Sequence, residues 1–201
     1  GQHTARCLYS KLWSLRQHAL TLMSEQVAQL PDARAVQVTA RVVVKCAADK
    51  MVQVFLASMA LFHALFAHPA VHALSRADWS SLVQPLTPIL ISKLGDGNVR
   101  VREAAEGSLL AMCRLAQIGA APIASALLAP TKKEMDVRYQ LGRLGLLHTM
   151  LTEFGDPLRD LAREIMKSIK AALESSKDTV RAKATDVAVE VYRLVGDIGL
   201  M

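Results

Sequence analysis

The sequence has 201 residues, which suits one domain or two very small ones. Hydrophobic residues make up 52% of it and charged residues 21%, which excludes a disordered tail, and the aromatic share of 4% argues against β-sandwiches and barrels and favours helices. The net charge of +6 is a modest excess, smaller than a dedicated nucleic-acid binder usually carries, so we expect no nucleic-acid partner.

In chain order, the apolar pattern predicts five helical hairpins, at residues 4–30, 31–68, 79–117, 121–154 and 157–196. A short polar turn joins the two helices of each hairpin, which makes them antiparallel neighbours. Hairpins of this kind cannot bury both faces alone, so we expect them to stack. The prediction is an all-α fold, an α-solenoid of about five HEAT-like hairpins in a single domain over residues 1–201.

The second hairpin leaves two alternatives open. Residues 36–44 alternate apolar side chains with a period of two, so a strand is possible, but no turn signal appears before Asp49, which favours a helix. Residues 51–75 carry no charged side chain and are long enough for a membrane span. Because Pro69 breaks this run and neighbouring helices can cover it, we expect a buried helix and no membrane partner.

Prolines mark the start of one predicted helix and a kink in another. Residues 157–173 give the clearest helical pattern, with Asp156 as the expected N-cap and Pro157 at the first helical position. Pro85 and Pro88 fall inside the helix predicted at residues 79–93, where we expect a kink.

A common pattern begins the second helix of four hairpins. The copies are Asp49-x-x-Val52, Asp96-x-x-Val99-Arg100, Asp136-Val137-Arg138 and Asp178-x-Val180-Arg181. Their valines lie 47, 38 and 43 residues apart, within the range of HEAT-type repeats. We expect the Asp to accept hydrogen bonds from the first helical turn and the Val to begin the buried stripe.

The positive charge is concentrated at the turns within the hairpins. The five turns, each with the start of its following helix, span residues 11–16, 45–50, 93–102, 132–138 and 177–183. These windows hold 13 basic and five acidic residues, a net charge of +8, whereas the remaining 165 residues sum to −2. Because all these turns face the same edge of a solenoid, the sequence predicts a basic binding edge that also carries Trp13.

The chain resembles TOG domains, the tubulin-binding HEAT arrays of microtubule regulators. The resemblance spans nearly the whole chain and is carried by Leu8-Tyr9-Ser10-Lys11-Leu12-Trp13-Ser14-Leu15-Arg16, Gly95-Asp96-x-x-x-Arg100-x-Arg102, Gly145-Leu146-Leu147 and Ala172-Leu173-Glu174. It implies tubulin contacts from Trp13, Lys50, Asn98, Arg100, Lys132, Lys133, Lys177 and Arg181. The second turn departs from the pattern, because Gln53 stands where other copies have Arg.

The resemblance also implies partners and a location. The partners are αβ-tubulin or microtubules, with other ciliary or centriolar proteins as further candidates. Within the family the chain is most similar to a TOG domain of a ciliary-tip protein, which implies the cytoplasm and cytoskeleton, the centriole and the ciliary tip. Because the chain begins at Gly1, we expect it to be a piece of a longer protein. A general HEAT scaffold that grips a peptide along its helical faces is the alternative.

Enzyme chemistry has little support in the sequence. The motifs of metalloproteases, P-loop nucleotide binders and serine hydrolases are all missing, so we expect no catalysis and no cofactor. His63, His68 and His72 do not predict a metal site, because Pro69 disrupts their helical register. The three cysteines lie at least 39 residues apart, which argues against a disulfide framework.

Overall fold

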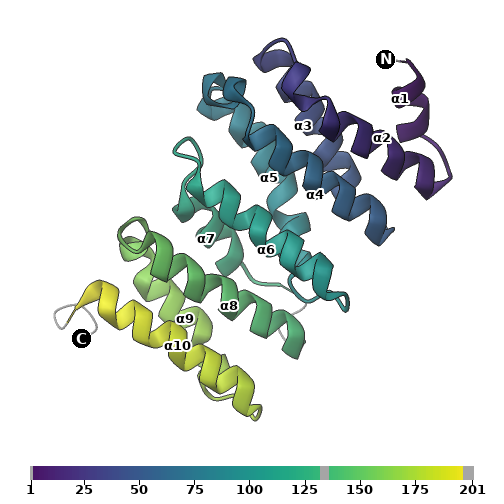
Figure 1. Ribbon diagram of the computed structural model, residues 1–201. Helices are drawn as coiled ribbons and strands as arrows, with labels where there is room; N and C mark the ends of the chain where they lie inside the picture. The colour runs from purple at the N-terminus through teal and green to yellow at the C-terminus, as the bar shows by residue number, and fades with distance from the viewer. Residues whose placement is uncertain (1, 132–135, 197–201) are drawn as a thin grey trace. The chain divides into compact units, whose positions relative to one another are not determined.

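The computed structural model describes residues 2–131 and 136–196 (Figure 1). The α-helices of this part of the chain are α1 (Gln2–Leu8), α2 (Trp13–Glu25), α3 (Ala33–Ala47), α4 (Val52–Phe66), α5 (Arg76–Lys93), α6 (Val99–Arg114), α7 (Ala120–Leu128), α8 (Val137–Phe154), α9 (Ala162–Leu173) and α10 (Asp178–Val195). Three short 3₁₀ helices accompany them: η1 (Val27–Gln29), η2 (Pro69–Ala73) and η3 (Asp156–Leu161). The prediction of an all-α fold made of HEAT-like hairpins is confirmed.

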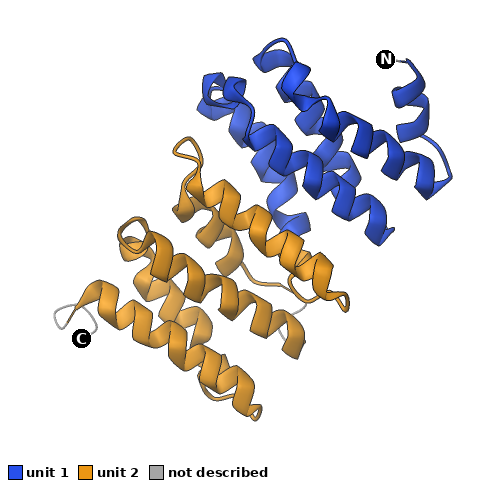
Figure 2. Ribbon diagram, viewed as in Figure 1, with its two compact units in different colours: residues 1–90 blue, residues 91–201 orange. Residues whose placement is uncertain are grey.

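The chain divides into two compact units (Figure 2). Unit 1 is Gly1–Leu90 and holds α1 to α4 with most of α5, and unit 2 is Ile91–Met201 and holds the later helices. The boundary falls inside α5, so the predicted third hairpin, residues 79–117, has residues in both units. A single domain over the whole chain stays a prediction.

In unit 1, α4 is the most enclosed helix. It packs against both α2 and α3, and seven of its side chains are buried. Phe66 at its end lies edge-to-face against the Trp79 ring of α5, with 5.2 Å between ring centroids. The uncharged run at residues 51–75 therefore forms a buried helix followed by η2, as expected. Within the described residues, every helix is too short or too polar to cross a membrane.

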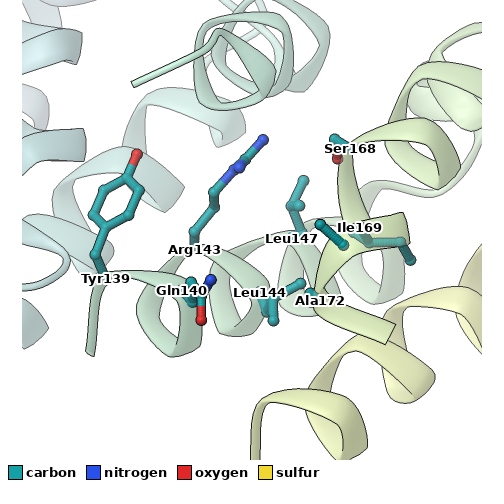
Figure 3. Close-up of a pocket in the computed structure, with 9 residues that line it drawn as sticks. Tyr139, Gln140, Arg143, Leu144, Leu147, Ser168, Ile169 and Ala172 are labelled. Atoms are coloured by element: carbon teal, nitrogen blue, oxygen red, sulfur yellow. The ribbon is translucent and has the colours of Figure 1, made fainter. Parts of the chain in front are cut away.

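In unit 2, α6, α8 and α10 run side by side, with their N-terminal ends at one edge (Figure 1). α10 packs against both α8 and α9, and α6 packs against α7. A cavity of about 60 Å³ is lined by residues of α8 and α9 (Figure 3). The even-numbered helices thus form one layer of unit 2, with their preceding turns at a common edge.

Residues 36–44 lie within α3, so the preferred helix is confirmed and the alternative strand does not form there. Two expected boundaries are corrected by the structure. The first hairpin was expected to be helical to residue 30, but α2 ends at Glu25 and η1 follows. The helix expected at residues 157–173 begins as η3 and becomes α-helical at Ala162, because the tighter winding buries Leu158 where η3 packs against α7.

The expectation that the Val of the repeated pattern begins the buried stripe is wrong for Val99, which is 52% exposed. In each of the four helices the first buried side chain belongs to the third residue, namely Val54 in α4, Val101 in α6, Tyr139 in α8 and Val180 in α10. Of these, only Val180 is the Val of the pattern. α4, α6 and α8 begin at the Val itself, whereas α10 begins two residues before Val180. The last copy of the pattern is therefore shifted by two residues relative to the others.

The Asp of the pattern has a different role in different copies. Asp136 accepts hydrogen bonds from two backbone amides in the first turn of α8, as expected. Asp49 and Asp96 instead accept from the residue that precedes the helix, and thereby fix the turn. Asp178 lies inside α10 and pairs with an Arg one turn later.

Candidate functional site

The candidate site of unit 1 is formed by the first two turns within the hairpins. Trp13 is the first residue of α2 and is 39% exposed, and Lys50 is exposed in the turn before α4. These turns are neighbours, because α2 packs against α4. Two residues that the sequence assigns to different hairpins therefore lie on the same edge of unit 1.

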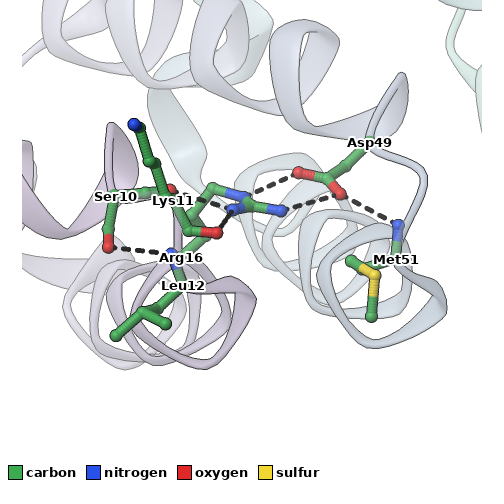
Figure 4. Close-up of polar contacts among 6 residues, drawn as sticks. All are labelled: Ser10, Lys11, Leu12, Arg16, Asp49 and Met51. Carbon is green, nitrogen blue, oxygen red and sulfur yellow. Dashed lines mark hydrogen bonds and ion pairs between the residues drawn. The ribbon is translucent and has the colours of Figure 1, made fainter.

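An ion pair fixes the two turns to each other (Figure 4). Nε and one Nη of Arg16 donate to the two carboxylate oxygens of Asp49, at 2.7 and 3.0 Å. The other Nη donates to the carbonyl oxygens of Ser10 and Lys11, at 2.9 and 3.1 Å. Asp49 also accepts from the Met51 amide at 2.9 Å. Arg16 thus joins its own turn to the next one, 33 residues along the chain.

The pKa of Asp49 reflects this network. Burial alone would raise the pKa of the carboxyl, but hydrogen bonds from Arg16 and from the Met51 amide outweigh it and hold the pKa below its ordinary value. The carboxylate is therefore ionised at neutral pH and keeps Arg16 in place.

An exposed apolar cluster surrounds Trp13. It consists of Tyr9, Leu12, Trp13 and Leu15, and we call it the first-turn cluster. Tyr9 is 74% exposed and Leu12 63%, and Lys45 places its ammonium 3.6 Å from the centroid of the Tyr9 ring. Sequence reasoning named Trp13 and missed its three neighbours, because a Leu beside a turn is as consistent with burial as with exposure.

The candidate site of unit 2 lies at the starts of α6 and α10. Arg100, Lys177 and Arg181 are exposed there. Asn98 is the N-cap of α6, and its side-chain oxygen accepts a hydrogen bond from the Arg100 amide at 3.0 Å. This oxygen therefore caps the helix and is already engaged within the chain. Lys132 and Lys133 lie outside the described residues.

Arginines of three helices donate to the carbonyl groups of the preceding turn. The bonds run from Arg16 to Ser10, from Arg102 to Asp96 at 2.7 Å and from Arg181 to Ser175 at 2.6 Å, and each spans six residues. The sequence pattern aligned Arg181 with Arg100, but by helix position it corresponds to Arg102 and Arg16. Arg181 also pairs with Asp178, so it has fewer donors available for a partner than Arg100.

Two kinds of reactive group, metal-ligand clusters and cysteine thiols, bear on whether the chain could support catalysis. No cluster of three or more His, Cys, Asp or Glu side chains is placed to hold a metal ion among these residues. Burial raises the pKa of Cys113 to about 12 and also raises the pKa of Cys46, so both remain thiols at neutral pH.

Solved TOG domains share the fold of HEAT-like hairpins described above. The chain belongs to the family described as Centrosomal protein CEP104, TOG domain, whose model matches residues 1–187. The resemblance to TOG domains found in the sequence is thereby confirmed, including the similarity to this particular member of the class.

Three relatives illustrate the similarity. The human "Centrosomal protein of 104 kDa" is 25% identical over 92% of this chain, which spans about 21% of that relative's length. The solved TOG domain of human Cep104 is 24% identical and has a TM-score of 0.77, covering 94% of this chain and 77% of its own. The third is a solved structure described as "Structural Basis of Tubulin Recruitment and Assembly by Microtubule Polymerases with Tumor Overexpressed Gene (TOG) Domain Arrays". It has a TM-score of 0.79 at 15% identity, and the match covers 97% of this chain and 40% of the other chain.

Proposed function

We propose that the chain is a non-catalytic module that binds αβ-tubulin or microtubules through the turns within its hairpins. The observation that carries this proposal is the first-turn cluster, in which Leu12 and Trp13 are exposed beside Lys11 and Lys50. Membership of the CEP104 TOG family supports it, as does the fold shared with the polymerase TOG arrays that recruit tubulin. A large exposed apolar cluster on a monomer usually marks an interaction site.

The two units would contribute differently to binding. In unit 1, desolvation of Trp13 and Leu12 supplies the affinity, because buried aromatic anchors dominate most interfaces. In unit 2, Arg100, Lys177 and Arg181 are exposed cations, which favour an acidic partner surface and chiefly raise the association rate. Lys132 and Lys133, outside the described residues, are proposed to add to this charge.

The proposed location follows from the relatives' name and from the sequence resemblance. We propose that the parent protein acts at the cytoskeleton, at the centriole and at the ciliary tip, with other centriolar or ciliary proteins as further partners. Because the chain spans about a fifth of the human relative, these proposals concern the whole protein and not this module alone.

The decisive experiment is gel filtration of the chain with unpolymerised αβ-tubulin at two salt concentrations. We expect co-elution that weakens with salt, and we expect Trp13→Ala to weaken binding by about 2–4 kcal/mol, which is roughly 30-fold to several hundredfold. Val38→Ala is the matched control, because Val38 is an exposed apolar residue of α3 away from the turns.

Each outcome of this experiment separates the alternatives. If the wild-type chain does not co-elute with tubulin, the proposed function is wrong. If Trp13→Ala binds normally and Val38→Ala does not, the partner lies along the helical faces, as a general HEAT scaffold would require. Lys177→Ala is a better test of charge than Arg181→Ala, because Arg181 also holds its own turn.

A further inference from the structure

The cavity between α8 and α9 carries an inference beyond the turn edge. α8 contributes Arg143, Leu144 and Leu147 to its lining, and α9 contributes Ser168, Ile169 and Ala172 (Figure 3). Its volume of about 60 Å³ exceeds the roughly 10–15 Å³ that a single water needs, so it has room for a small functional group. Most of its wall is apolar, which strengthens any electrostatic interaction made inside it.

Arg143 brings an uncompensated positive charge to this cavity. Its Nε is buried and has no hydrogen-bond partner, and no ion pair of Arg143 occurs among the described residues. Five of the other thirteen arginines pair with an acid in the described structure, namely Arg16, Arg114, Arg159, Arg181 and Arg193. The described lining of the cavity contains no carboxylate. The Arg143 side chain as a whole is half-buried, and its buried Nε leaves at least one guanidinium N–H free to bind a ligand in the cavity.

The chemistry of the lining identifies the group that fits. A guanidinium offers five N–H donors in a planar fork that matches a carboxylate in two parallel hydrogen bonds. The Ser168 hydroxyl already donates to the Ile165 carbonyl at 2.8 Å, so it presents lone pairs rather than a hydrogen to an anion. One positive charge within an apolar wall therefore suits a monoanion and leaves a phosphate dianion undercompensated.

We propose that this cavity receives a single carboxylate group, held by the Arg143 guanidinium. The cavity is lined by the beginning of α8 and the end of α9, and its lining residue Ala172 lies five residues before Lys177, so the cavity is beside the turn edge of unit 2. The carboxylate has two possible sources, a small free carboxylate or an acidic side chain of the protein partner. The second source rests on the proposed tubulin binding, whereas the first does not.

The test uses acetate as the free carboxylate and αβ-tubulin as the protein. The ¹⁵N–¹H resonance of the Arg143 Nε group is followed while acetate replaces chloride at constant ionic strength, and thermal unfolding midpoints are measured in parallel. Arg143→Met removes the guanidinium but keeps the apolar stem, and Arg143→Lys keeps the charge without the fork. Arg163→Met is the matched control, because Arg163 is exposed on α9 outside the cavity.

A free carboxylate site predicts a saturable shift of the Arg143 resonance and a rise in the unfolding midpoint with acetate, both lost in Arg143→Met and retained in Arg163→Met. A partner carboxylate predicts that Arg143→Met weakens tubulin binding about tenfold or more, that Arg143→Lys restores part of it, and that Arg163→Met leaves it unchanged. If acetate leaves both readouts unchanged and tubulin binding tolerates Arg143→Met, the proposal is overturned. If the wild-type chain does not bind tubulin, the proposed function fails while the acetate measurements still decide on the cavity.

Discussion

The two units connect the turns of neighbouring hairpins by different means. In unit 1, the ion pair between Arg16 and Asp49 connects the first turn to the second. In unit 2, the turn after α5 contacts α8 through close backbone packing, with glycines where the segments meet. A Cβ on Gly142 would overlap the carbonyl oxygen of Leu94, and a Cβ on Gly95 would lie 2.8 Å from the Tyr139 Cβ. We call the contact between Arg16 and Asp49 the polar joint, because it depends on charge. We call the contact of Gly142 and Gly95 with Leu94 and Tyr139 the steric joint, because it depends on the absence of a glycine side chain.

This difference bears on what each edge can offer a partner. In unit 1 the ion pair uses a base and an acid of the turns, and the exposed surface beside it is the apolar first-turn cluster. In unit 2 the steric joint uses no charged group, and Arg100 and Lys177 are exposed near it. Both edges carry exposed bases, and the exposed Trp and Leu side chains of the first-turn cluster distinguish the edge of unit 1.

The steric joint can be broken with one methyl group. We expect Gly142→Ala to lower the free energy of unfolding by about 3 kcal/mol, because the overlapping atom belongs to the Leu94 backbone and cannot rotate away. Gly107→Ala in α6 is the matched control, since its Cβ would have no described atom within 4 Å, and we expect it to stabilise the chain by about 0.5–1 kcal/mol. Urea unfolding of both variants measures the contrast, and equal effects would show that α8 can move away from Leu94.

The polar joint is tested by comparing Arg16→Met with Arg102→Met. Arg16 makes four hydrogen bonds, two of them to a carboxylate, whereas Arg102 bonds only to carbonyls of its own turn in the described structure. We expect losses of about 2 kcal/mol for Arg16→Met and about 1 kcal/mol for Arg102→Met in the free energy of unfolding. A larger loss for Arg102→Met would mean that the local bonds, and not the connection between turns, stabilise this edge.

These joints also explain which features the sequence could predict. Periodicity placed the hairpins, because a helix that buries one face needs apolar residues every three or four positions, as α8 and α10 have. Trp13 was found because an isolated Trp beside basic turns is conspicuous. The start of α9 was misplaced, because Pro157 suits a 3₁₀ turn as well as an α-helix.

The features that were missed depend on distant contacts. Gly142 sits in an ordinary helical pattern, and only the approach of Leu94 shows why a side chain is excluded there. Arg143 looks like any solvated helix residue in the sequence, and only the packing of α8 against α9 shows that it lines a cavity. The partner of Arg16 is likewise 33 residues away, and nothing in the local sequence selects Asp49 over another acid. Long-range pairing of this kind is fixed by packing and not by local pattern.

The smallest expected effect concerns pH and the polar joint. The pKa of Asp49 is lower in the folded chain than the value of about 3.9 of an unfolded Asp, so its stabilisation is fully present above about pH 4 and is lost as the pH falls through the folded pKa. Asp49→Asn keeps one acceptor oxygen but not the charge, so we expect it to be about 1 kcal/mol less stable than the wild type at pH 7. The gap should close below about pH 4 in urea unfolding series.

Asp156→Asn serves as the control for this pH series, because Asp156 forms an ion pair with Arg159 in which both side chains are exposed. Such a pair contributes little in water, so we expect almost no gap at any pH. Carboxylates elsewhere are protonated in wild type and variants alike, and their contribution cancels in the difference. A gap for Asp49→Asn that does not narrow as the pH falls below about 4 would mean that Asn disturbs the turn itself, and that the joint of unit 1 depends on shape in the same way as that of unit 2.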